Sequence, residues 1–211
     1  MTFTIARTGQ ILRYNVSWQE LEEILAERED SSASRLAYDR GTLEIIMPLL
    51  EHEYFKEIIS LLVQDLAEEL DIDYESFGST TWKREDKLAG VEPDNCFYIE
   101  KEPLIRGRLD IDLRQDPPPD LVLEIDLTSK SLDRQPIYAR LGVPEMWRYD
   151  KGKLLIYQLE SGDYAETETS LFFADFPVKE IPGFVRDNLG IGRRAIRKKF
   201  RAWVAQQRRS V

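Results

Sequence analysis

Acidic residues stand among apolar ones at two places in this sequence. The first is the segment 120–128, which reads DLVLEIDLT. A β-strand there would place Asp120, Glu124 and Asp126 on one face and leucine and isoleucine side chains on the other. Carboxylates that lie close together repel one another unless they are solvated, protonated or bound to a cation. One face of this strand therefore suits a hydrophobic core, and the other suits a cation.

The second acid lies upstream, in the sequence Glu92-Pro93-Asp94 that precedes a strand-like segment at 95–99. If the two segments meet, Asp94 and Glu124 would supply carboxylate ligands to a hard cation such as Mg²⁺ or Mn²⁺. Asp126 would add a third oxygen ligand. We therefore predict a metal-binding active site where these two strands come together.

Hydrolysis of a phosphodiester also needs a positive group near the scissile phosphate. Lys130 and Arg134 follow Glu124 within ten residues, and Lys83 lies on another predicted strand. His52 is the only histidine and begins the longest predicted helix, where it could orient a water molecule or contact substrate. These residues complete the candidate catalytic set, with Lys130, Arg134 and His52 as its members outside the acid pair.

Each of these residues also has a structural explanation. Asp94 could cap a turn after Pro93, and the acids at 120–126 could face solvent, so spacing alone does not choose between the explanations. His52 could simply pack and form a hydrogen bond at the start of its helix. Three functional classes follow: a metal-dependent nuclease, a non-catalytic protein acting in binding or assembly, and, with least support, a carboxylate-pair glycoside hydrolase.

The hydrophobic periodicity predicts an α/β protein with a mixed sheet flanked by helices, in one domain spanning residues 1–211. A capping box at Ser17 predicts a helix over 18–27, and a turn at Gly41 predicts a hairpin over 36–47. Further helices are predicted at 51–70, 133–141, 181–189 and 192–207, with a short one within 101–113. Further strands are predicted at 71–77, 80–84, 95–99, 120–128, 146–149, 154–159 and 164–168, and 1–13 as an arm or edge strand.

The amino-acid composition bears on the binding partners and the cellular location of the protein. The net charge of −10 argues against avid general binding to nucleic acid, although residues 193–209 contain eight basic residues and no acid. We expect this stretch to be the solvated face of a helix rather than a phosphate-binding patch. Apolar runs are too short for a transmembrane helix, and the single Cys96 fits a reducing, cytoplasmic location.

A homodimer is suggested by the aromatic residues Trp147, Phe172, Phe173, Phe176 and Trp203, because one domain has difficulty burying them all.

Six short motifs together resemble the Uma-two family of restriction-endonuclease-like proteins, which belongs to the PD-(D/E)XK nuclease superfamily. They stand in the family's order and extend over about residues 15 to 160. The motifs are YDRGTLE at 38–44, EHE at 51–53, FGSTT at 77–81, EPD at 92–94, PDLVLE at 119–124 and YARLGVPEMW at 138–147.

The resemblance implies a restriction-endonuclease-like central mixed β-sheet flanked by helices, and a divalent-metal site that cleaves DNA. It implies that Asp94 is the first catalytic acid and Glu124 the second. The superfamily's usual lysine, two residues after the second acid, is replaced by Asp126. The family often has a basic residue four positions before the tyrosine of the next helix, and here Arg134 stands four before Tyr138. Arginine stabilises phosphate charge but remains protonated, so it is a poor general base.

Overall fold

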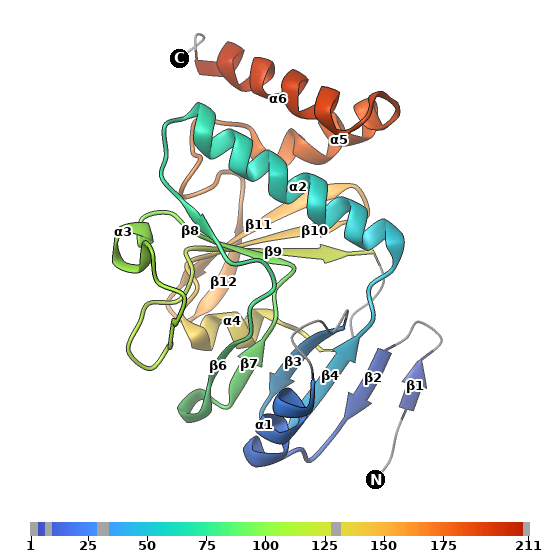
Figure 1. Cartoon of the computed structure of the whole chain (residues 1–211), viewed down its shortest axis with the longest axis vertical. Coiled ribbons are helices and arrows are strands. Elements are labelled where there is room, and N and C mark those ends of the chain that lie inside the picture. The colour runs from blue at the N-terminus through green and yellow to red at the C-terminus, as the bar shows by residue number, and fades with distance from the viewer. Residues whose placement is uncertain (1–3, 7–9, 29–33, 128–131, 209–211) are drawn as a thin grey trace.

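The computed structural model describes residues 4–6, 10–28, 34–127 and 132–208. These residues form helices α1 to α6 and strands β1 to β12 (Figure 1). The strands are β1 (Thr4–Ala6), β2 (Gln10–Arg13), β3 (Arg35–Asp39), β4 (Thr42–Ile46), β5 (Glu75–Ser76), β6 (Trp82–Arg84), β7 (Ala89–Val91), β8 (Asn95–Tyr98), β9 (Leu121–Asp126), β10 (Glu145–Asp150), β11 (Lys153–Glu160) and β12 (Asp163–Thr167). The helices are α1 (Trp18–Glu27), α2 (Leu50–Glu69), α3 (Glu102–Ile105), α4 (Gln135–Leu141), α5 (Ile181–Asn188) and α6 (Arg193–Arg208).

The strands form two six-stranded sheets. The first has the order β1-β2-β4-β3-β7-β6, and all its neighbours are antiparallel. The second has the order β12-β11-β10-β9-β8-β5 and is mixed, because β9 and β10 run parallel. The predicted α/β class with a mixed, helix-flanked sheet is confirmed, and an antiparallel sheet stands beside it.

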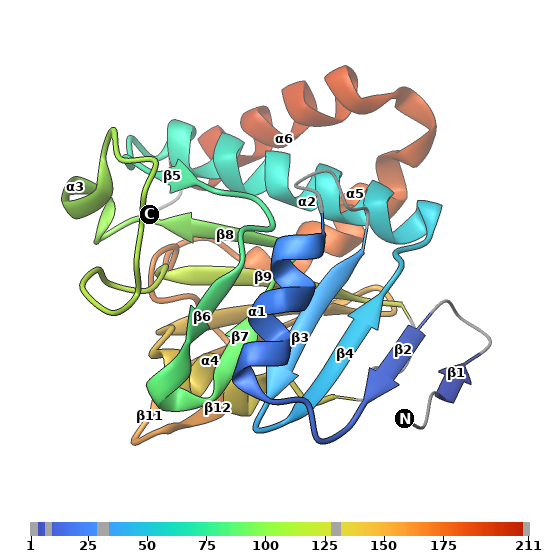
Figure 2. The ribbon, with the colours of Figure 1, turned by 60° about the horizontal axis from the view of Figure 1, so that its bottom comes forward.

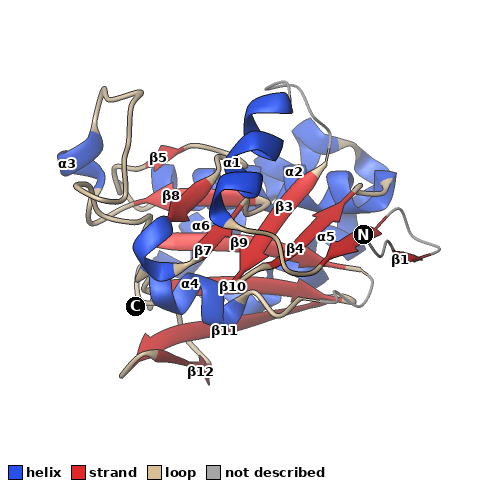
Figure 3. Cartoon of the chain, turned by 90° about the horizontal axis from the view of Figure 1, so that it is seen from below, coloured by secondary structure: helices blue, strands red, loops and turns tan. Residues whose placement is uncertain are grey.

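Strand β9 lies in the middle of the mixed sheet, between two hydrophobic layers. On one face α2 packs Ile58, Ile59 and Leu62 into a core that includes Leu123 and Trp147, and α6 lies beyond α2 (Figure 1). The other face meets a second core, to which α4 and the first sheet both contribute side chains. Figures 2 and 3 show the ribbons of these elements around the mixed sheet. Burial on both faces is why the acids of β9 are not on the surface.

The structure therefore excludes the explanation in which the acids at 120–126 face solvent. Asp120, Glu124 and Asp126 are all buried. Asp120 accepts hydrogen bonds from the backbone N–H groups of Ile99 (2.7 Å) and Lys101 (2.9 Å), so it fixes the turn after β8. Of the three acids in the row, Asp120 thus has a structural explanation.

Local signals set the elements around β9. Ser17 accepts from the Glu20 N–H at 3.2 Å, and the Glu20 carboxylate accepts from the Ser17 N–H at 2.7 Å, which completes the capping box of α1. Pro136 lies in the first turn of α4, where its missing N–H costs nothing. Gly142 ends α4 with a φ of 82°, a left-handed conformation that favours glycine.

The basic stretch near the C-terminus faces α2 in part, which differs from the expected solvated face. Asp65 of α2 is fully buried, and its carboxylate accepts from Arg197 at 2.8 Å through both oxygens and from Arg201 at 2.8 Å. Burial of a carboxylate is tolerated when cations and hydrogen bonds satisfy it. Helix α6 is therefore held to α2 by charge as well as by apolar packing.

Two strands differ from the prediction. Strand β7 is not predicted from the sequence, and the segment predicted as a strand at 71–77 is extended only in β5.

The aromatic residues that suggested a homodimer lie inside the chain. Trp147, Phe173 and Phe176 are buried, and Phe172 and Trp203 pack against the same core. The aromatic residues therefore give no reason to expect a homodimer.

Among the described residues, no helix combines the length and the apolar character that crossing a bilayer requires.

Candidate active site

The pairing of β8 with β9 places Asp94 opposite Glu124. Asn95 pairs with Leu123 and Cys96 with Val122, so the residue before β8 faces the next residue of β9. The Asp94 N–H donates to the Leu123 carbonyl at 3.1 Å, and the Asp94 Oδ2 accepts from the Ile125 N–H at 2.7 Å. Asp94 and Glu124 are each only 2% exposed. The structure thus brings the two predicted acids together across adjacent strands.

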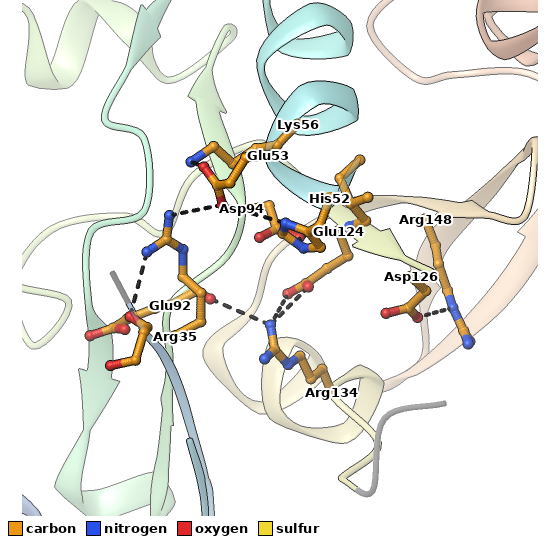
Figure 4. Close-up of polar contacts among 12 residues, drawn as sticks. Arg35, His52, Glu53, Lys56, Glu92, Asp94, Glu124, Asp126, Arg134 and Arg148 are labelled. Carbon is orange, nitrogen blue, oxygen red and sulfur yellow. Dashed lines mark hydrogen bonds and ion pairs between the residues drawn. The ribbon is translucent and has the colours of Figure 1, made fainter. Parts of the chain in front are cut away.

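His52 reaches this pair from the first turn of α2. Its Nε2 lies 3.1 Å from the Asp94 Oδ2, so Asp94 is held by a backbone donor and by a ring nitrogen (Figure 4). The other ring nitrogen, Nδ1, lies 3.5 Å from a carboxylate oxygen of Glu53. His52 is therefore fixed between two acids, and the structure places it beside one of the predicted site residues.

Arg134, immediately before α4, contacts Glu124. Its Nη1 donates to the two carboxylate oxygens at 2.9 Å and 2.8 Å (Figure 4). The Tyr138 hydroxyl donates to the Oε1 of the same carboxylate. Burial alone would lower the Arg134 pKa, but the charges of Glu124 and Asp94, together with Tyr138 and the hydrogen bond to Glu124, outweigh burial and raise the pKa. Burial and the charge of Glu124 raise the Tyr138 pKa as well. Arg134 therefore remains a cation and Tyr138 a neutral donor.

A third buried acid approaches Arg134 from the first sheet. The Glu44 Oε2 of β4 lies 3.9 Å from the Arg134 Nη2. The Oε1 of Glu44 accepts from the Gln10 amide at 2.5 Å and from the Leu132 N–H at 3.1 Å. The Arg134 guanidinium is therefore placed between carboxylates of the two sheets and links them.

Asp126 pairs with Arg148 of β10, whose Nε lies 2.6 Å from the Asp126 Oδ2. This contact gives Asp126 a partner, and its role as a third metal ligand stays a prediction. Lys83 pairs with Glu22 of α1 and does not contact the acid pair in the described structure. Lys130 lies outside the described residues, so its predicted role also stays a prediction.

The comparison with known protein families assigns this chain to a family. A model of the Uma2 family, described as "putative restriction endonuclease", matches residues 18–188. The chain belongs to the Uma2 family. Among solved structures, the Uma2 chain is similar to a crystal structure from Anabaena variabilis described as a "putative nuclease". The two share 17% identity over 77% of this chain and 97% of that chain, with a TM-score of 0.48. The comparison with curated proteins gives no significant match.

The Uma2 match includes Asp94, Glu124, Arg134 and His52, whereas α6 lies beyond it. Arg148 also lies within it, yet it was absent from the candidate residues. Its place depends on the parallel pairing of β9 with β10, in which Arg148 stands opposite Glu124. A strand pattern of Met146, Arg148 and Asp150 on one face is visible in the sequence, but the partner strand is not.

The acid pair of this Uma2 protein fits one class of metal. Within the described ranges, no group of three or more histidine, cysteine, aspartate or glutamate side chains could hold a single ion. A closed cage of protein ligands is therefore not formed by those residues. Mg²⁺ and Mn²⁺ commonly keep several water ligands and use one or two carboxylates, which is what Asp94 and Glu124 offer.

Proposed function

We propose that this Uma2 protein is a divalent-metal-dependent endonuclease that hydrolyses phosphodiester bonds of DNA. The observation that carries the proposal is a pair of buried acids, Asp94 just before β8 and Glu124 on β9, which the register of the two strands places opposite each other. Each is held by a residue from a different helical segment, His52 for Asp94 and Arg134 for Glu124. Buried acids that are fixed in this way are suited to bind a hard cation in one geometry.

In this proposal Asp94 and Glu124 hold Mg²⁺ or Mn²⁺. When bound, such an ion polarises the phosphodiester and makes a water molecule more acidic. His52 and the Ile125 N–H orient the Asp94 carboxylate through its Oδ2. Arg134 and Tyr138 orient the Glu124 carboxylate, and Arg134 also offsets its charge. Arg134 stays protonated, so it acts as a positioning cation rather than as a general base.

Cleavage of plasmid DNA at low salt tests the proposal, because the net charge of −10 opposes DNA binding. We expect nicking with Mg²⁺ or Mn²⁺, its loss in EDTA and its return when metal is restored. Glu124→Gln and Asp94→Asn should each abolish nicking. Glu100→Gln is the matched control, because Glu100 is an exposed acid just after β8. Cleavage that survives Glu124→Gln would assign the activity to a contaminant.

A second candidate is a non-catalytic nuclease-fold protein acting in binding or assembly. It is favoured by the residue two positions after Glu124, which is Asp126 in an ion pair with Arg148 rather than a lysine. Calorimetry separates the candidates. Binding of Mn²⁺ that Glu124→Gln abolishes, without cleavage of any DNA or RNA, would support the non-catalytic candidate. The homodimer predicted from the sequence has lost its argument, because the aromatic residues that suggested it pack within the chain. Light scattering would decide it, and a monomeric mass would remove it.

A further inference from the structure

We infer that Arg148 is the residue that contacts the DNA phosphate next to the acid pair, an inference that rests on the proposed function. A cation that contacts substrate must be reachable, and Arg134 is not. Its side chain is 5% exposed, one nitrogen donates to both Glu124 oxygens, and another lies 3.9 Å from Glu44. Withdrawing it would leave two buried carboxylates without that cation, which is strongly unfavourable.

Arg148 continues the row of site residues across the mixed sheet. Asp94 stands opposite Glu124 on β9, and Glu124 stands opposite Arg148 on β10. Residues directly opposite each other in adjacent strands point to the same face. Arg148 therefore flanks Glu124 on the side away from Asp94, as Figure 4 shows. The row joins two acids that suit a metal to a cation that suits a phosphate.

The Arg148 side chain is 36% exposed, in contrast to Arg134. Its Nε lies 2.6 Å from Asp126, so the acid fixes one edge of the guanidinium. A guanidinium has five N–H donors in a planar fork, and its terminal nitrogens suit the oxygens of a phosphate. Asp126 thus positions Arg148. Asp126 occupies the place where the superfamily usually has a lysine, and we infer that it acts there by orienting the Arg148 side chain.

Binding to a fluorescein-labelled duplex tests this, measured by anisotropy in the Glu124→Gln background to prevent cleavage. Arg148→Gln should weaken binding about tenfold at low salt, because one charge-assisted contact is lost. The slope of log affinity against log salt should fall in magnitude by about 0.9 over about 50 to 200 mM salt. Arg148→Lys should keep the slope, since it keeps the charge. Arg114→Gln, which removes an exposed arginine that also pairs with an aspartate, should change neither affinity nor slope.

Loss of Arg148 also leaves the charge of Asp126 without that partner, which by itself would repel DNA. The double variant Asp126→Asn with Arg148→Gln separates the two effects. It should still bind more weakly than the protein that keeps both residues, because the phosphate contact is absent, and full recovery of the affinity would overturn the inference. An unchanged salt slope in Arg148→Gln, in a protein whose cleavage depends on Glu124, would overturn the inference and leave the proposed function standing. Absence of both DNA binding and cleavage in the wild type would overturn both.

Discussion

One nitrogen of Arg134, Nη1, lies within 2.9 Å of both carboxylate oxygens of Glu124. Under the proposed function, this buried ion pair should affect both the stability of the fold and the cleavage of DNA. Arg134→Ala removes the cation but keeps Glu124 and Glu44 buried, so it should destabilise the fold by about 3–5 kcal/mol. Urea unfolding at neutral pH measures the loss. If Arg134 and Glu124 act as a unit, Arg134→Ala and Glu124→Gln should reduce cleavage by similar factors, and the double variant should lose little more. Additive losses would contradict a shared role.

The contact between His52 and Asp94 predicts a positioning role for the histidine. His52→Ala should lower cleavage and the affinity for Mn²⁺ by about 10- to 100-fold, the range for residues that orient metal ligands. His52→Gln should recover part of both, because its amide can still donate to the Asp94 carboxylate. Glu57→Gln, one turn further along α2, is the control and should have little effect. Manganese affinity that is unchanged in His52→Ala would show that the ring does not orient Asp94.

The Cys96 thiol should be unreactive toward thiol reagents in the folded protein. Burial raises the pKa of its thiol to about 12, and its sulfur contacts the Trp82 ring nitrogen at 3.4 Å. The thiolate is the reactive form, so at pH 8 almost none is present. We expect no reaction with Ellman's reagent under native conditions and one thiol per chain in denaturant. Rapid native labelling would mean that the second core opens readily around Cys96.

The contact of α2 with α6 predicts a strong dependence on one acid. Asp65→Ala would remove the buried carboxylate that accepts from Arg197 and Arg201, while Arg201 keeps its ion pairs with Glu68 and Glu69. It should destabilise the fold by about 2–4 kcal/mol. The acid pair is on the far side of the mixed sheet from this contact, so cleavage per folded molecule should persist. Urea unfolding and the plasmid assay on the same preparation measure the two effects. Glu27→Gln serves as the control, because Glu27 is an exposed acid at the end of α1. Loss of cleavage in fully folded Asp65→Ala would show that α6 acts on the site.

Sequence patterns predicted those elements whose signals are local. The capping box at Ser17, the turn at Gly41 and the proline and glycine at the two ends of α4 set boundaries that agree closely with the structure. The acids Asp94 and Glu124 were recognisable because carboxylates beside apolar strands are unusual. The short strand β7, with glycine at its centre, carries no such signal and is stabilised by pairing with β3 and β6.

The features of the site that could not be predicted depend on which strands pair. Arg148 stands beside Glu124 only because β10 pairs with β9 in parallel, and no local sequence pattern indicates which strands are neighbours. The burial of Glu124 and Glu44 depends on α4 and on the first sheet, which approach from distant parts of the chain. Long-range packing, rather than local propensity, therefore decides which acids are buried and which cations reach them.

Gln10 and Arg197 lie outside the family match, yet each contacts a buried acid inside it. The family match spans residues 18–188, yet Gln10 donates to buried Glu44 and Arg197 to buried Asp65. A fragment trimmed to the match would lose a donor at one buried acid and both arginines at the other. Such a fragment should misfold or aggregate, whereas a fragment spanning residues 10–208 keeps every one of these contacts.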